Sequence, residues 1–364
     1  MTVHFPRKHL VLLGAGRAHM QVLQGLARQG ENGVHVTLVA PLPYYIEAAM
    51  LPGYLAGAYA LEDIRVPLEH LLQASGASFA EAQVRSLDPV ARRVQLSSGD
   101  ALPYDVLSID VEPTMDRDEI EAWIPGAHHN ALFARPLESF VHLWPRLRAL
   151  ARERALHVAV IGYGLPGAEL AMATAQALAL PHGCHVTLLT GDAPPLLDVQ
   201  PPALQRRLLA RLKALNITAL QDHCVSLGGG TLQLTCGARL ECDAAIVSAG
   251  DSAPDWLLQS GLRIGNDGLP VVNGHLQSAS HRQVFVAPPE ASDEIGAALL
   301  ANLRIALGGG AFRKVPATLS CLKVVAGGGG HAIAVWGRLS LEGREVWHWK
   351  DRRDRRHLAA LVRP

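Results

Sequence analysis

Two glycine-rich turns carry the clearest chemical signal in this sequence. The first, Gly14–His19, reads GAGRAH, follows a short apolar run and opens a helical pattern. The second, Gly162–Gly167, reads GYGLPG and is a complete G-x-G-x-x-G in the same context. In such a turn the first glycine permits a tight bend, and the second lets a pyrophosphate approach the backbone amides at the helix start. Both turns indicate dinucleotide binding, and the second is the stronger match.

A tight strand-to-helix turn without a ligand is the alternative for both motifs. In the first, His19 stands where the third glycine is usual, and the next strand ends at Val39–Pro41 without the acid that would hold a ribose. The strand after the second turn ends at Leu189–Asp192, and Asp192 is either a ribose ligand or an exposed loop residue. The sequence therefore does not separate NADH from NADPH.

The elements that position these turns repeat along the chain. Each turn lies in a strand, glycine turn, helix, strand unit, which is the unit that builds a parallel sheet. The two turns start 148 positions apart, and two such units are hard to obtain by accident. The expected strands are His9–Leu13, Val34–Val39, Leu156–Ile161 and His185–Leu189, and the expected helices are Arg17–Arg28 and Ala168–Leu178.

Composition excludes several other classes. The chain has 364 residues, 49% of them hydrophobic, and a formal net charge of zero, which gives no global attraction to nucleic acid. None of the five cysteines forms a close redox pair, and the 17 histidines show no metal-ligand spacing, so we expect no metal site. No signal-like run or membrane-length apolar window is present, which favours a cytoplasmic protein without a transmembrane segment.

The residues also resemble a known family. The opening stretch His9–Leu23 is similar to the pyridine nucleotide-disulfide oxidoreductase superfamily, nearest to its type II NADH dehydrogenase-like branch and to the flavoprotein modules fused to selenide–water dikinase. The resemblance runs over nearly the whole chain in ordered landmarks. These are Met50–Gly57, Leu102–Asp110, Ala249–Gly250, Pro254–Leu257, Leu276–Ser278 and Trp347–Asp351.

The resemblance implies FAD in the first unit and NAD(P)H in the second, with hydride passing from nicotinamide to flavin. It implies cofactor contacts at Gly14, Ala15, Gly16, His19, Gly162, Gly164, Gly167 and Gly250. It places Glu169 near nicotinamide and flavin. The alternative is that Glu169 is an ordinary polar residue on the first turn of a helix, where the dipole favours an acid. Without a cysteine pair, electrons would pass directly to a small acceptor such as a quinone. Peripheral membrane contact and a homodimer are both compatible with the resemblance.

Three departures from the family pattern concern the flavin. Ala287–Glu290 reads APPE where the family carries alanine, glycine and aspartate, and only Glu290 or Asp293 could compensate for that aspartate. Asp110–Thr114 puts carboxylates and a proline in a turn of small residues beside FAD. Glu290–Asn302 is short for the loop and flavin-covering helix of the family. FAD is therefore expected to be weakly held or substoichiometric.

The sequence predicts an α/β fold with two Rossmann-like dinucleotide-binding domains and a C-terminal α+β subdomain. The expected FAD-type domain is residues 1–115 and 265–312, the NAD(P)-type domain is 116–264, and the C-terminal interface subdomain is 313–364. The predicted function is an FAD-dependent NAD(P)H:acceptor oxidoreductase. The alternative is a non-catalytic, weakly flavin-binding nucleotide or partner-binding protein on the same scaffold.

Overall fold

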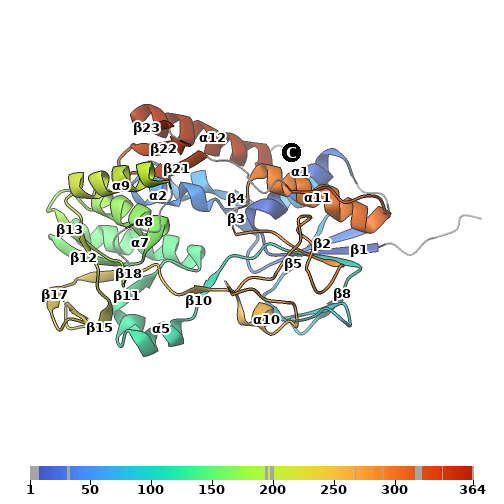
Figure 1. The fold of residues 1–364 in the computed structure, drawn as a ribbon, viewed down its shortest axis with the longest axis horizontal. Coiled ribbons are helices and arrows are strands. Elements are labelled where there is room, and N and C mark those ends of the chain that lie inside the picture. Colours follow the sequence, from blue (N-terminus) through green and yellow to red (C-terminus); the bar gives the residue numbers. More distant parts are fainter. Residues whose placement is uncertain are drawn as a thin grey trace, which may run out of the picture.

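A five-stranded parallel sheet forms the centre of the first unit, on the right of Figure 1. The structure, a computed structural model, describes residues 8–30, 33–192, 196, 201–266, 268–289, 291–315, 322–337 and 339–362. The strand order is β20-β9-β1-β2-β5. Its edge strand β20 comes from the part of the chain that follows the second unit. The strands are β1 Lys8–Leu13, β2 Val34–Ala40, β5 Ser78–Glu81, β9 Val106–Ile109 and β20 Val284–Val286.

A second five-stranded parallel sheet has the order β11-β18-β12-β13-β14 and lies on the left of Figure 1. Its strands are β11 Ala131–Phe133, β12 Leu156–Ile161, β13 Cys184–Leu189, β14 Thr218–Leu220 and β18 Ala244–Val247. The main helices of the two units are α1 Arg17–Arg28, α4 Glu69–Ser75, α7 Leu137–Ala151, α8 Gly164–Ala177, α9 Pro202–Ala214 and α11 Asp293–Gly308. Apolar strands covered by helices are typical of parallel sheets, and the α/β prediction is confirmed.

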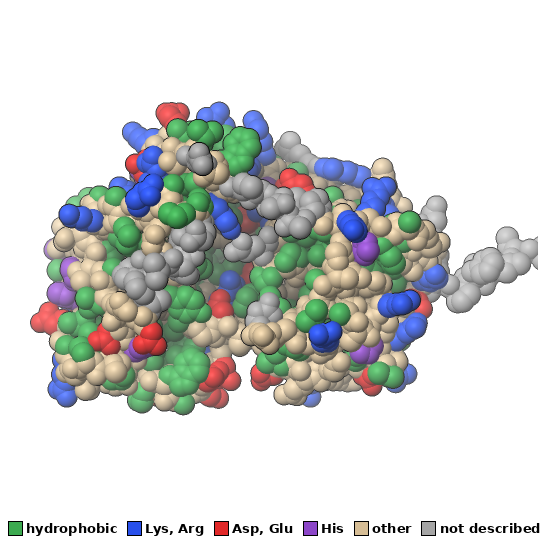
Figure 2. Space-filling view, viewed as in Figure 1, with side chains coloured by type: hydrophobic (Ala, Val, Ile, Leu, Met, Phe, Trp, Pro, Cys, Tyr) green, Lys and Arg blue, Asp and Glu red, His purple; other side chains and the backbone are tan. Residues whose placement is uncertain are grey.

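The two units are joined by two segments of the chain that run between them side by side. Strand β10 Thr114–Met115 pairs antiparallel with β19 Asp251–Ser252, and on the face in Figure 2 a notch separates the two lobes below this crossing. Smaller antiparallel sheets flank each lobe: β6 Val84–Asp88, β7 Arg93–Leu96 and β8 Ala101–Pro103; and β15 Cys224–Gly228, β16 Thr231–Leu234 and β17 Arg239–Glu241. The domain boundaries named above stay predictions.

The C-terminal segment is a three-stranded antiparallel sheet followed by a long helix, as the sequence predicts. It consists of β21 Leu322–Ala326, β22 Ala332–Trp336, β23 Leu339–Gly343 and α12 Arg344–Val362. Figure 1 shows it across the top of both lobes, with α12 reaching over the first. A buried ion pair anchors α12: Lys350 Nζ lies 2.6 Å from Asp354 Oδ2 and donates to the Ala49 carbonyl at 2.6 Å.

The remaining elements are short. They are β3 Tyr44–Ile46, η1 Ala48–Met50, α2 Leu51–Leu55, α3 Leu61–Ile64, β4 Arg65–Pro67, α5 Arg117–Trp123, α6 Ala127–Asn130 and α10 Asp255–Leu258. Within the described ranges, no helix combines the length and the apolar character that a membrane crossing requires.

The segment after β20 contains a long helix. Helix α11 runs for 16 residues from Asp293, and the expectation that Glu290–Asn302 is short for the family stays a prediction. Its start carries ordinary helix signals: Ser292 caps the Ile295 amide, and Asp293 and Glu294 stand in the first turn, where the helix dipole favours acids. These residues fix the start of α11 directly after the short loop that follows β20.

We predict that Asp354→Ala destabilises the fold by about 3–5 kcal/mol, because it leaves the Lys350 ammonium buried without its partner. Thermal or denaturant unfolding measures the loss. The matched control is Asp351→Ala, which breaks the more exposed i,i+4 pair with Arg355 on the same helix and should cost about 1 kcal/mol or less. Replacing both partners, as Lys350→Met with Asp354→Leu, should recover most of the loss. Equal losses for Asp354→Ala and Asp351→Ala would contradict this account.

Candidate functional site

The first glycine turn is packed against the residue that follows β9. Gly14 has φ +91°, and a Cβ there would lie 2.2 Å from the Asp110 carbonyl oxygen, so no other residue fits. The Gly14 amide donates to the Val39 carbonyl at 2.8 Å, which ties the turn to the end of β2. A Cβ at Gly16 would lie 2.3 Å from the Asp110 carboxylate. The turn therefore has the expected glycine geometry, with a carboxylate lying against it.

Asp110 places that carboxylate on the amides at the start of α1. Its Oδ2 accepts from the His19 amide at 2.8 Å, and the carboxylate also accepts from the Ala18 amide. These are two of the three helical amides that lack an acceptor within the helix. Burial raises the pKa of Asp110, and His19 together with the two amides opposes the rise. The side chain thus occupies the position at which a helix start binds anions.

His19 fills the space beneath the turn. Its ring is fully buried, with Nδ1 2.7 Å from the Gly14 carbonyl oxygen and Nε2 2.8 Å from Ser108 Oγ. Burial lowers the pKa of His19, against the influence of Asp110. Only its backbone amide points toward the site, so the imidazole works as a spacer between α1 and β9.

A pocket of about 400 Å³ opens beside this turn, within the range of small-molecule sites. Gly14, Ala15 and Gly16 form one wall, and the tip of β2 at Ala40 forms another. The aromatic lining comes from Tyr44, Tyr45 and Trp256, and the acidic lining from Asp110, Glu112 and Glu138. The pocket therefore combines flat apolar walls with carboxylates.

Glu112 stands where this pocket meets a smaller one of about 170 Å³. Its side chain is 42% exposed, and it lines both of these recessed spaces. Burial raises its pKa to about 7; Arg135, 2.9 Å away, opposes the rise, and Glu138, Asp110 and Glu47 add to it. Arg135 also pairs with Asp251 at 3.2 Å, so it links the turn after β9 to the strand crossing between the lobes.

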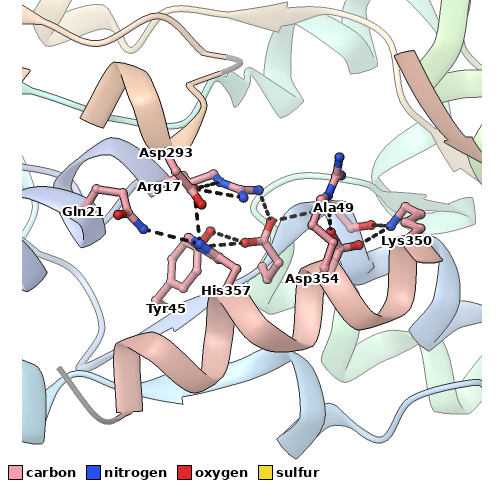
Figure 3. Close-up of polar contacts among 10 residues, drawn as sticks. Arg17, Gln21, Tyr45, Ala49, Asp293, Lys350, Asp354 and His357 are labelled. Atoms are coloured by element: carbon pink, nitrogen blue, oxygen red, sulfur yellow. Dashed lines mark hydrogen bonds and ion pairs between the residues drawn. The ribbon is translucent and has the colours of Figure 1, made fainter. Parts of the chain in front are cut away.

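A second polar cluster ties α1, α11 and α12 together (Figure 3). Arg17 contacts Asp293 at 3.1 Å and Glu47 at 3.5 Å, and His357 of α12 lies 3.2 Å from Asp293 and 3.3 Å from Glu47. The hydrogen bond from His357 and the Arg17 charge lower the pKa of Asp293 to about 2. Asp293, one of the two acids that could replace the family aspartate, is thus engaged in an internal network. Glu290, the other, lies outside the described residues.

Among the residues that the structure describes, no carboxylate lies against the second glycine turn in this way. A Cβ at Gly167 would lie 2.7 Å from the Gly162 carbonyl carbon, which is the close packing that requires the third glycine. Gly164 has φ +63° and begins α8. A Cβ at Gly162 would meet Ser248, whose carbonyl oxygen lies at 3.0 Å. Tyr163, the N-cap residue, is 61% exposed and makes no capping hydrogen bond with its side chain.

The other predicted site residues lie apart from the pockets described above. Gly250 has φ +81°, and a Cβ there would lie 3.5 Å from the Ile120 side chain; Asp192 is an exposed residue 3.0 Å from His223. Glu169 accepts from the Ala326 amide at 2.7 Å, and burial raises its pKa against the pull of that amide and Lys350. Glu112 and Asp110 were predicted as obstacles to the cofactor, but the amide contacts of Asp110 could not be read from sequence.

Comparison with known proteins defines the class. Residues 8–288 match the family model of the pyridine nucleotide-disulphide oxidoreductases, and the chain belongs to this family. It is therefore an oxidoreductase, and membership implies FAD and NAD(P)H as the cofactors of its two units.

Particular relatives are more distant. A type II NADH:quinone oxidoreductase of Staphylococcus aureus is 27% identical over 169 residues, which is 45% of this chain and 42% of the relative. That of Staphylococcus saprophyticus is 30% identical over 106 residues, 29% of this chain and 26% of the relative. The matches thus span less than half the length of these curated relatives.

Solved structures extend the likeness of fold over nearly the whole chain. The sulfide:quinone oxidoreductase of Aquifex aeolicus has a TM-score of 0.80 at 17% identity, covering 98% of this chain and 92% of that chain. NDH2 of Plasmodium falciparum in complex with NADH has a TM-score of 0.77 at 12% identity, covering 98% and 97%.

FAD fits the first site in shape more than in charge. The glycine turn, the aromatic walls and the pocket beside β2 suit a dinucleotide with a flat ring system. The polar contacts are altered: Asp110 lies on the helix amides, Ala40 stands at the ribose position, and Pro288 and Pro289 follow β20. The residues present would hold FAD through backbone and apolar contacts, against the repulsion of nearby carboxylates.

We predict that FAD binds about tenfold more tightly near pH 6 than near pH 8. With a pKa of about 7, Glu112 is mostly protonated near pH 6 and mostly ionised near pH 8, and only the ionised form repels a pyrophosphate. Titration of flavin fluorescence at the two pH values measures the ratio. Glu112→Gln should flatten the dependence, and an unchanged slope in that variant would assign it to another group.

Proposed function

We propose that the chain is an NAD(P)H:acceptor oxidoreductase that binds NAD(P)H at the second glycine turn and FAD, weakly, at the first. The observation that carries the proposal is the pair of glycine turns, each at the carboxyl end of its own parallel sheet, with an aromatic pocket beside the first. Bound FAD would supply the two-electron carrier between nicotinamide and acceptor.

The weak hold on FAD follows from the contacts that are missing. An acid at Ala40 would give a charge-assisted hydrogen bond to ribose, worth about 1.5–3 kcal/mol, and an aspartate at the Pro288–Pro289 position would give a comparable one. If the two losses add, affinity falls by about two to four decades. A nanomolar site would then become micromolar or weaker.

The proposed acceptor is a quinone, which would receive electrons directly from the reduced flavin without a cysteine relay. Both the curated relatives and the fold neighbour from Aquifex aeolicus carry quinone in their names. Burial raises the pKa of Cys224 and Cys242 to about 11 and that of Cys184 to about 12, so these thiols hold their protons at neutral pH and are poor nucleophiles. Cys236 is exposed, and Cys321 lies outside the described residues.

Glu169 is the proposed acid near the reacting groups, supported by its burial and raised pKa. It is the only acidic residue of α8, and its carboxylate accepts from the Ala326 amide at the end of β21. A purely structural role in holding β21 explains the same contact, and the two roles can be separated by substitution.

Three expectations stay predictions. Peripheral membrane contact has support in the exposed apolar side chains Trp336, Leu339 and Leu341 of β22 and β23. Figure 2 shows hydrophobic side chains beside lysines and arginines at the top of the molecule, where the C-terminal segment lies. Cross-strand pairing of Trp336 with Leu339 places two of them on one sheet face. Homodimer formation through the same segment and a cytoplasmic location are the other two.

We expect the purified protein to carry substoichiometric FAD after dialysis and to regain flavin absorbance when excess FAD is added. NADH or NADPH should then bleach the flavin band, and a soluble quinone should restore it. Visible absorption spectroscopy under anaerobic conditions measures both steps. Full, tightly held flavin after extensive dialysis would refute the weak site, and absence of bleaching by either nucleotide in the reconstituted protein would refute the proposed function.

We predict that Glu169→Gln lowers turnover by about tenfold or more at unchanged NAD(P)H affinity and unchanged unfolding temperature, because the amide oxygen still accepts from Ala326 but no proton can be exchanged. Glu169→Ala, which removes the hydrogen bond as well, should also lower stability by about 1–3 kcal/mol. Steady-state kinetics and thermal unfolding separate the two effects. Full turnover in Glu169→Gln would leave Glu169 a structural residue.

A further inference from the structure

The two glycine turns occupy equivalent places, which allows a position-by-position comparison within one molecule. Leu13 of β1 is in register with Ile109 of β9, and the next residue, Asp110, donates its amide to the Leu13 carbonyl at 2.8 Å. In the second unit Ile161 is in register with Val247, and the next residue, Ser248, donates to the Ile161 carbonyl, also at 2.8 Å. Asp110 and Ser248 are therefore structural equivalents.

The side chains at these equivalent positions differ in charge and in what they contact. Asp110 is 8% exposed, and its carboxylate accepts from the Ala18 and His19 amides, on the axis where a helix start attracts anions. The Ser248 side chain is neutral, because it ends in a hydroxyl where Asp110 ends in a carboxylate. Its Cβ lies 3.1 Å from where a Cβ of Gly162 would be, and no acid stands in the first turn of α8.

We propose that Asp110 is a built-in anion that takes the pyrophosphate subsite of the first unit, and that the Asp110–Ser248 difference sets the unequal dinucleotide affinities of the two units. The inference rests on the proposed function, since that function assigns FAD to the first turn and NAD(P)H to the second. It adds the residue that decides how tightly each turn binds.

The physical reason is competition for the same donors. A pyrophosphate that approaches the start of α1 meets two amides already engaged by a carboxylate, in a buried place where like charges repel strongly. Binding therefore requires the carboxylate to move or to become protonated. No acid stands in the first turn of α8, and no described side chain caps its start, so the nucleotide gains its amide contacts there without displacing a described partner.

The decisive variant is Asp110→Ser, which copies the second unit into the first. We expect FAD affinity, measured by titration of flavin fluorescence or by calorimetry, to rise at least about tenfold over the parent. Asp110→Asn keeps the shape and a hydrogen-bond acceptor without the charge, and should give a smaller rise; it also serves if Asp110→Ser folds poorly. The matched control is Asp105→Asn, whose carboxylate accepts from the His9 amide at 2.7 Å before the start of β9, away from the pocket.

The reciprocal variant is Ser248→Asp, which should weaken NAD(P)H binding at least about tenfold and leave FAD affinity unchanged. Unchanged FAD affinity in both folded Asp110 variants would overturn the inference, whether or not NAD(P)H binds. A rise equal to that of Asp105→Asn would overturn it as well, because the effect would then be a general one of removing a carboxylate. Failure of the parent to bind either nicotinamide cofactor would instead refute the proposed function, since the FAD comparison does not depend on it.

Discussion

The close packing of backbone at each glycine turn is the constraint on which the rest of this structure depends. A Cβ at Gly14 would lie 2.2 Å from the backbone oxygen of Asp110, and one at Gly167 would lie 2.7 Å from the backbone of Gly162. Backbone atoms cannot yield as a flexible side chain can, so these positions admit only glycine. The turns in consequence hold α1 and α8 with their amide-bearing ends over the edges of the two sheets, where ligands of such folds bind.

The charged residues between the two sheets are positioned by the way the units are joined. The chain crosses between them twice, at β10 and β19, and Arg135 pairs with Glu112 on one side and Asp251 on the other. This places the Glu112 carboxylate at the mouth of the first site, where burial raises its pKa to about 7 and Arg135 opposes the rise. The charge of the pocket is thus tied to the connection between the lobes, and a change at one alters the other.

The C-terminal helix closes the arrangement from a third side. His357 lies between Glu47 and Asp293, and Arg17 at the start of α1 contacts both of those acids (Figure 3). The starts of α1 and α11 are therefore held together by residues of this chain alone.

The sequence by itself determined the two units, most element bounds near the glycine turns and the oxidoreductase family, because apolar periodicity and glycine spacing are local properties of the chain. Helix α1 and strand β12 have the predicted bounds, and Ser292 with the two acids after it marks the start of α11 in the sequence. Only the tertiary structure decided which groups share the first site. Asp110 lies 91 positions from His19, and His357 lies far beyond Glu47, so their contacts arise from strand order and helix docking. No spacing rule records such contacts, since they depend on which strand neighbours β1 and on where α12 comes to rest.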